Sequence, residues 1–313
     1  MSGGVEEARG RRPGRGRRFL SQWRFQLVLV PVTIWALVFF YLPAAGNIIA
    51  FQDYRLDKGY LRSSFVGLKH FADFLQNQLT LVLLRNTLAM SFLGLISGTV
   101  AAIVFAILLN EIVRSAPKRV VQTVSYLPYF VSMAICANLF IQLLSRTGPI
   151  NQMLLSAGLS DKPIPFLEIG PLFWWILTLQ GVWKNVGWNA IIYIAAITSI
   201  DPQIFEAAYA DGAGRTRRIW HITLPLLLPT VAILLILNSG YLIMGGFEQQ
   251  LLMFNPVVMD YAEVLQTYVY KRGIGHQQYS FAAAVNLFQS VVSVTIILVV
   301  NRLFKRFTES SIW

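Results

Sequence analysis

Six long apolar runs divide the sequence, and short polar stretches separate each run from the next. Each run holds the roughly 20 residues that a helix needs to cross the hydrocarbon core of a bilayer. The pattern therefore predicts six transmembrane helices, at about 26–50, 87–110, 120–144, 172–198, 224–247 and 281–303. Residues 1–20, rich in Gly and Arg, are predicted to form a disordered basic tail before a transmembrane domain that covers 21–313.

Two further segments are interpreted from the same pattern. The stretch Phe65–Leu84 is partly apolar but contains Lys69, His70 and Asp73, so it is predicted to be an amphipathic surface helix rather than a span. Gly94 and Gly98 are spaced for close contact between helices in lipid, and we expect them to serve packing only.

Composition agrees with a membrane protein. Of the 313 residues, 55% are hydrophobic and 13% are charged, whereas a soluble domain carries about 25% charged residues. The single cysteine, Cys136, lies in an apolar run, so it can form no disulfide within the chain and is expected to be buried in a helix.

The distribution of basic residues predicts the orientation. The N-terminal segment, the loops after spans two and four, and the C-terminus hold sixteen Lys and Arg, whereas the loops on the other side hold nine. Because basic residues concentrate on the cytoplasmic side, both termini are predicted to be cytoplasmic. The net charge of +11 is then explained by topology and by attraction to anionic lipid, without nucleic-acid binding.

The loop between spans four and five, residues 199–223, is longer than a connection requires. Asp201 can cap a helix whose first residue is Pro202, and Gly212 can end that helix in the left-handed region. A second short helix through Arg215–His221 is expected to lead back into span five. The loop therefore presents a small cytoplasmic helix with an exposed face, which suggests a docking surface.

Glu206-Ala207-Ala208, Asp211-Gly212-Ala213 and Ile222-Thr223-Leu224-Pro225 resemble the "EAA" loop of the permease subunits of bacterial ATP-binding-cassette (ABC) importers. Other segments are similar to the oligo- and polysaccharide subgroup, and most similar to the first permease subunit of the alginate importers of Gram-negative sphingomonads. These segments are Gly67–Phe71, Gln122–Pro128, Gly187–Tyr193 and Ser310–Trp313.

The resemblance implies an all-α, six-span type I permease in the bacterial inner membrane, whose coupling helix inserts into a cleft on a separate ATPase subunit. The residues implied in that coupling are Glu206, Ala207, Ala208, Asp211, Gly212, Ala213, Leu224 and Pro225. The implied partners are a second homologous permease, two ATPase subunits that hold the ATP and Mg²⁺, a periplasmic solute-binding protein, and a saccharide cargo, with alginate as one candidate. The chain has no Gly-x-x-x-x-Gly-Lys-[Ser/Thr] loop, so it is not expected to bind ATP itself or to be an enzyme.

Lys184 is the one charge near the middle of a predicted span, where a lysine costs on the order of 3 kcal/mol. It could line a cavity and meet the cargo, with Trp183 or Trp188 stacking on sugar rings. It could instead form a buried pair or hydrogen-bond the backbone and fix helix packing. The candidate substrate path is Lys184, Asn185, Trp183, Trp188, Asn189 and Asn286. No metal site is predicted, because His70, His221 and His276 are scattered over loops.

Two other functions stay open. The chain could serve an importer of another solute class, or it could be a secondary transporter driven by an ion gradient. The second class usually shows internal repeats and acidic residues within spans, and no carboxylate lies within a predicted span here. Co-purification of an ATPase subunit would separate an importer permease from a secondary transporter.

Overall fold

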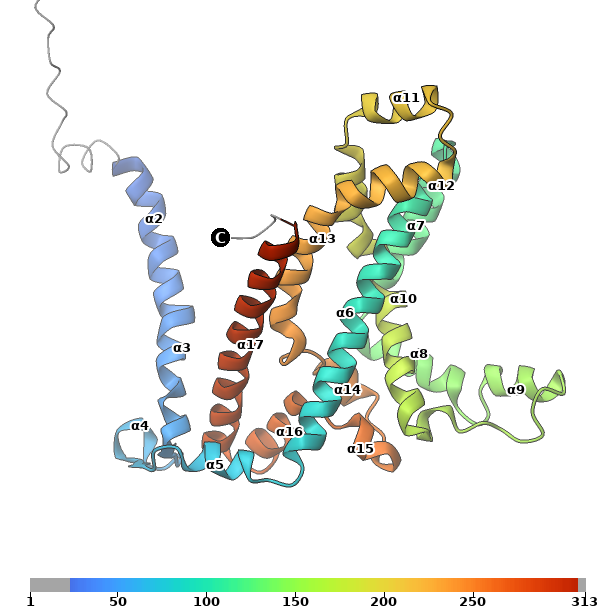
Figure 1. Ribbon diagram of the computed structural model, residues 1–313. Helices are drawn as coiled ribbons and strands as arrows, with labels where there is room; N and C mark the ends of the chain where they lie inside the picture. The colour runs from blue at the N-terminus through green and yellow to red at the C-terminus, as the bar shows by residue number, and fades with distance from the viewer. Residues whose placement is uncertain (1–22, 309–313) are drawn as a thin grey trace, which may run out of the picture.

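A computed structural model describes residues 23–308 of the chain, which form a bundle of long helices (Figure 1). The predicted tail over residues 1–20 and the segment Ser310–Trp313 lie outside the described residues. Among the described residues, four helical stretches are long and apolar enough to cross a membrane, and the number rises to six if each of two bent helix pairs is one span. The fold is therefore the all-α membrane bundle that the sequence predicts.

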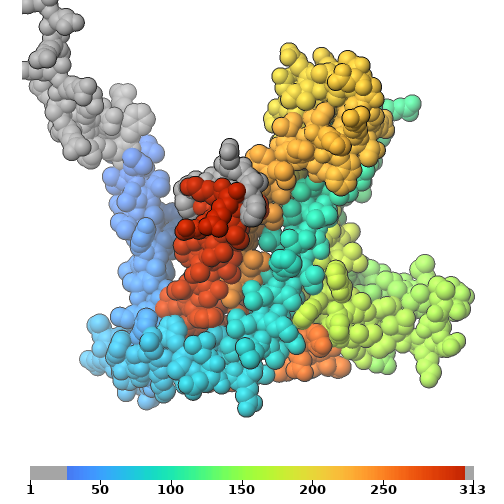
Figure 2. Space-filling view, in the orientation of Figure 1, coloured from blue at the N-terminus to red at the C-terminus, as the bar shows by residue number. Residues whose placement is uncertain are grey.

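The first span is a nearly continuous helix that stands apart from the bundle (Figures 1 and 2). It consists of α2 (Trp23–Ala36), a π-helical turn, α3 (Leu42–Ala45) and a 3-10 segment (Gly46–Phe51). None of the most apolar window of this span is buried. The 3-10 segment is the part that packs against the last helix, α17 (Tyr279–Thr308).

The surface helix predicted over Phe65–Leu84 is confirmed only in part, because the structure has the short helix α5 (Lys69–Leu75) in its middle. An antiparallel ribbon of β1 (Gln52–Asp53) and β2 (Ser64–Phe65) precedes it, in which Gln52 pairs with Phe65. The short helix α4 (Gly59–Arg62) lies between the two strands. The Asn77 side chain then accepts a hydrogen bond from the Leu79 amide, and this local turn starts α6 (Thr80–Asn110) seven residues before the predicted span.

The predicted third span over 120–144 is also not one helix. Helix α7 (Ser115–Phe130) and the helical segment that starts with α8 (Met133–Leu144) meet at a bend of 99°. Val131 and Ser132 are extended at the bend, and the Ser132 hydroxyl caps α8 by accepting from the Ile135 amide at 3.4 Å. An N-cap serine thus begins a new helix inside a continuous apolar run.

The rest of the chain alternates long helices with short ones. Helix α10 (Gly170–Thr198) matches the predicted fourth span, and α11 (Pro202–Ala210) turns away from it by 70°. The predicted fifth span over 224–247 ends early, because α13 (Leu224–Ser239) gives way to a 3-10 turn that stops at Leu242, before Gly245 and Gly246. The remaining helices are α9 (Pro149–Ser156), α12 (Arg215–Arg218), α14 (Glu248–Leu252), α15 (Met259–Ala262) and α16 (Leu265–Tyr270).

Helices α6 and α10 form the central pair of the bundle. Their contact buries Ala102, Ala106 and Ala190 completely, and small side chains allow such close approach in lipid. Helix α11 lies at one end of the molecule, and α5, α15 and α16 lie at the opposite end (Figure 1). We refer to these as the α11 end and the α16 end.

Candidate functional site

A cavity of about 520 Å³ opens between α6, α10, α13 and the segment that follows α13. Eight polar side chains lie on its wall: Ser91, Thr99, Asn189, Tyr193, Asn238, Tyr241, Gln249 and Gln250. A smaller cavity of about 180 Å³ shares Asn189 and both glutamines with it and extends to Asn185. The two together make a path lined by amides, hydroxyl groups and aromatic rings along the inner faces of α6 and α10.

Two glycines of α6, Gly94 and Gly98, leave space at the cavity wall. Apart from the local backbone of α6 itself, no heavy atom lies within 4 Å of where a Cβ would stand on Gly94 or Gly98, and both residues belong to the wall. The expectation that they serve packing only is therefore wrong within this chain. Their missing side chains contribute to the width of the cavity.

The segment after α13 brings the two glutamines to the wall. Gly246 has φ +90°, which other residues rarely adopt, and a Cβ there would overlap the amide of Gln250. The side-chain amide of Gln249 donates to the Leu177 carbonyl at 2.7 Å and to Oε1 of Gln180 at 2.8 Å, and these hydrogen bonds hold the segment against α10. Sequence reasoning missed Gln249 and Gln250, although the Gly245-Gly246 pair inside an apolar run signals a break in the span.

Lys184 is buried, at 8% exposure, and it does not belong to the wall of either cavity. Its ammonium group donates to the carbonyls of Pro128 at 3.2 Å and Tyr129 at 2.9 Å, and also to the carbonyl of Val131. These carbonyls lie where α7 ends at the bend, and the Pro128 carbonyl also accepts from the Val131 amide at 3.2 Å. The structure thus shows the packing role for Lys184 rather than the expected place on the cavity wall.

The other predicted path residues are divided among different surroundings. Asn185 and Asn189 line the cavities, and Asn286 lines a separate cavity of about 390 Å³ beside the first span. Trp188 stacks on Tyr129 of α7, with ring centroids 4.4 Å apart and planes 4° apart. The Trp183 ring lies beside the Phe140 ring of α8, with ring centroids 5.7 Å apart. The two tryptophans therefore pack α10 against α7 and α8 and lie outside the cavity wall.

The loop that holds α11 has the local geometry expected from its sequence. Oδ1 of Asp201 accepts from the Gln203 amide at 2.9 Å, Pro202 opens the helix, and Gly212 has φ +72°. Glu206, Ala207, Asp211 and Pro225 are exposed, and Ala208, Ala213 and Leu224 are partly exposed. The loop thus gathers the predicted coupling residues on the surface at the α11 end.

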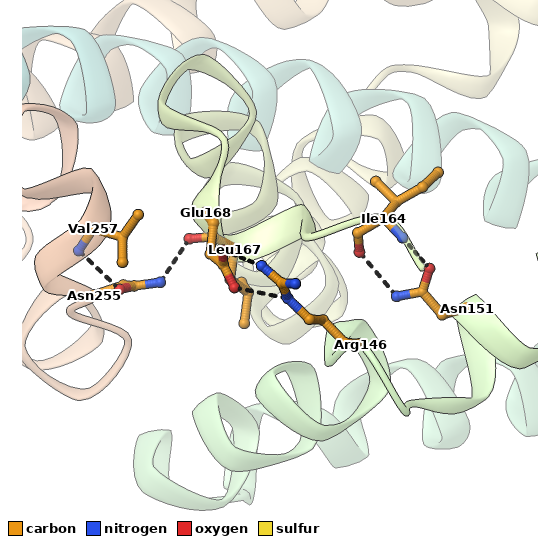
Figure 3. Close-up of polar contacts among 7 residues, drawn as sticks. All are labelled: Arg146, Asn151, Ile164, Leu167, Glu168, Asn255 and Val257. Atoms are coloured by element: carbon orange, nitrogen blue, oxygen red, sulfur yellow. Dashed lines mark hydrogen bonds and ion pairs between the residues drawn. The ribbon is translucent and has the colours of Figure 1, made fainter. Parts of the chain in front are cut away.

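An arm projects from the molecule away from the α11 end, and polar contacts hold it at its base (Figures 1 and 3). It covers residues 146–168 and includes α9. Arg146 pairs with both carboxylate oxygens of Glu168, at 3.2 and 2.6 Å, and this hydrogen-bonded pairing lowers the pKa of Glu168. Asn151 is fully buried and binds the Ile164 backbone through both its oxygen and its nitrogen. The Asn255 amide, which donates to the Leu167 carbonyl, joins the arm to the loop before α15.

Comparison with known proteins links this geometry to transport. The family model described as "Binding-protein-dependent transport system inner membrane component" matches residues 94–309. Protein LplB of Bacillus subtilis is 40% identical over 94% of this chain and 92% of its own length. The polygalacturonan/rhamnogalacturonan transport system permease protein YteP of B. subtilis is 39% identical over 95% of this chain and 92% of its own length.

Among solved structures, one chain superposes with a TM-score of 0.86 at 34% identity, covering 95% of this chain and 99% of its own length. It belongs to a bacterial alginate ABC transporter in complex with an alginate pentasaccharide-bound periplasmic protein. The likeness extends over nearly the whole chain.

Proposed function

We propose a function from one premise: this chain belongs to the family of binding-protein-dependent transport system inner membrane components. It is therefore a membrane component of an importer in the inner membrane and is not itself a catalyst. On this premise we infer that it is the permease subunit of an ATP-driven importer of oligo- or polysaccharides. The observation that carries the cargo class is the cavity wall of amides and tyrosines between α6, α10 and α13.

The chemistry of this wall fits a saccharide. Side-chain amides such as Asn189 and Asn238 can donate to and accept from sugar hydroxyl groups, and Tyr193 and Tyr241 add hydroxyl groups and ring faces. The cargo of two of the similar proteins points the same way, since one is a permease for polygalacturonan or rhamnogalacturonan and another belongs to an alginate transporter. Alginate and other acidic polysaccharides are thus candidate cargoes.

The proposed assembly has this chain beside a second homologous permease, with two ATPase subunits at the α11 end and a solute-binding protein at the α16 end. In this orientation the α11 end and both termini are cytoplasmic. ATP binding by the ATPase subunits would favour one of two global conformations, and α11 would transmit that preference to the cavity. The exposed Glu206 and Ala207 support this placement, because both are free to contact a partner surface.

The cargo is tested with the complex reconstituted in vesicles. ATPase activity is measured with binding proteins loaded in turn with neutral and acidic oligosaccharides, and we expect saccharide-loaded protein to stimulate hydrolysis. Failure of ATPase subunits to co-purify with the permease would contradict the assembly and favour a secondary transporter. Stimulation by a loaded binding protein for a non-saccharide solute alone would contradict the cargo class.

The role of the α11 loop is tested by two glycine variants. Gly212→Ala places a Cβ on a residue with positive φ, which costs about 1–2 kcal/mol and distorts the turn. Gly214→Ala is the matched control, because Gly214 has φ −67° and open space around it. We expect stimulated ATPase activity and uptake to fall in Gly212→Ala, and more strongly in Glu206→Lys, while Gly214→Ala stays near wild type. Normal uptake by Glu206→Lys would exclude a contact at this residue.

A further inference from the structure

Arg218, on α12, is the buried charged residue of the α11 loop, at 8% exposure. Its guanidinium carbon stands 3.6 Å from the centroid of the Tyr209 ring, on the last turn of α11. Nη1 of Arg218 also donates to the Ala213 carbonyl at 3.4 Å, in the turn that follows α11. One side chain of α12 thus contacts both the helix and the turn that precede it.

This contact is suited to fixing the orientation of α11. A guanidinium group is planar and stacks on aromatic faces while its edge donates hydrogen bonds, so it can hold a ring and a carbonyl at once. The turn itself supplies little else, because Gly212 has no side chain and α12 has only four residues. Without Arg218, α11 would be held by its backbone links to α10 and α12 and by two backbone hydrogen bonds in the turn, from the Ala213 amide to the Ala208 carbonyl at 2.9 Å and from the Gly212 amide to the Tyr209 carbonyl at 3.0 Å.

Helix α12 belongs to the same helical span as several residues that line the cavity. The π-helical turn Ile219–Thr223 joins α12 to α13, and together they form one helical span from Arg215 to Leu242. Leu234, Asn238, Tyr241 and Leu242 of this span belong to the cavity wall. Arg215 and Glu111 also approach to 3.6 Å, which connects α12 to the end of α6, a helix that also lines the cavity.

We propose that Arg218 is a positioning residue that clamps α11 to the Arg215–Leu242 span through Tyr209, so that a displacement of α11 is transmitted to the cavity. This rests on the proposed function, in which α11 contacts an ATPase subunit. Arg218 is buried, whereas Tyr209 is 63% exposed and can contact a partner subunit. The clamp therefore joins the surface of α11 to the buried side of α12. In the absence of the clamp, α11 could still dock, but its movement would bend the turn instead of moving α13.

The test compares four variants in the complete reconstituted complex. Arg218→Met removes the guanidinium, and Arg217→Met is its matched control, since Arg217 is the exposed neighbour on the same short helix. Tyr209→Leu removes the ring, and Tyr209→Phe keeps the ring without its hydroxyl. The measurements are co-purification of the ATPase subunits, ATPase stimulation by loaded binding protein, and cargo taken up per ATP hydrolysed.

We expect Arg218→Met and Tyr209→Leu to lower uptake per ATP by about fivefold, the effect of losing one cation–π contact on a partly exposed ring, with ATPase subunits still bound. Arg217→Met and Tyr209→Phe should stay near wild type. Uptake per ATP at the wild-type value in Arg218→Met overturns the proposal, and so does loss of the ATPase subunits in this variant, which would indicate a docking defect. An unmodified complex without ATPase subunits would instead contradict the proposed function itself.

Discussion

At the scale of single residues, Lys184 shows how a charge inside a span is accommodated. A charge in the middle of a span needs a partner. The partner turned out to be the end of another helix, at Pro128, Tyr129 and Val131, and that end exists because α7 stops at Val131. A break 53 residues earlier in the chain is a tertiary fact that no local pattern around Lys184 contains.

Replacement of Lys184 should therefore affect stability rather than cargo choice. Lys184→Met removes the ammonium donor of three carbonyls, of which that of Pro128 also accepts from a backbone donor, the Val131 amide. The loss costs about 2 kcal/mol or more and lowers the unfolding midpoint of the protein in detergent by about 5 °C. Lys162→Met, at an exposed lysine of the arm, is the control and should unfold as wild type. A variant with unchanged stability and altered cargo selectivity would restore the binding role that the sequence suggested.

Gly187 is a second residue that acts through the same helix pair. A Cβ here would overlap the carbonyl oxygen of Ser125 on α7, whereas a Cβ on Gly181 of the same helix meets nothing within 4 Å. Gly187→Ala should lower the free energy of unfolding by about 1–3 kcal/mol, because α10 and α7 must separate. Gly181→Ala should be neutral or slightly stabilising. Equal thermal stability of the two variants would show that α7 can shift at no cost.

At the scale of elements, apolar length predicted the spans that are single helices and failed where a span is broken. The fourth and sixth spans were predicted within a few residues of α10 and α17. The third and fifth were not, because Ser132 and the Gly245-Gly246 pair interrupt the helix without interrupting the apolar run. Hydropathy measures transfer to lipid, and a cap or a positive φ contributes almost nothing to it.

The arm over residues 146–168 provides a prediction at this scale. The pairing with Arg146 lowers the pKa of Glu168 below its ordinary value of 4.5, so the paired state contributes in full above that value and is lost as the pH falls through the lowered pKa. With spin labels at Leu159→Cys and Val257→Cys, the distance distribution should stay narrow from neutral pH to about 4.5 and broaden below it.

The control for the arm is Glu168→Gln, which keeps the shape of the side chain without its charge. We expect this variant to show the broad distribution at every pH, since the ion pair is then absent. Cys136 is buried, so the two introduced cysteines are the accessible labelling positions within the described chain. A narrow distribution in Glu168→Gln would indicate that Asn151 and Asn255 hold the arm without the ion pair.

At the scale of the whole molecule, the sequence predicted the class of fold and the family, and it did not predict the cavity. The α11 loop is local, so Asp201, Pro202 and Gly212 could be assigned from their neighbours along the chain. The cavity is assembled from α6, α10, α13 and the segment after it, and its wall depends on the rotation of each helix. Of the predicted path, Asn189 lies on this wall, and Asn185 lies on the wall of the smaller cavity beside it.

Gly98 gives a direct test of whether this cavity is the path. Gly98→Phe places a large side chain into open space on the wall, so it should abolish uptake while the protein inserts at a normal level. Gly98→Ala adds one methyl group and should retain most of the uptake. Full uptake by Gly98→Phe, measured in the same vesicles, would place the path elsewhere.

The separation of the first span from the bundle has a consequence for biogenesis. Gly46–Phe51 packs on α17, so the earliest hydrophobic segment of the described chain completes its contacts on the last one to be synthesised. Until α17 has been inserted, Gly46–Phe51 lacks this contact, while α6 and α10 can already associate. Release from the translocon and closure of the fold are therefore separate events, and a stall during synthesis would leave an inserted but unclosed intermediate for membrane proteases to recognise.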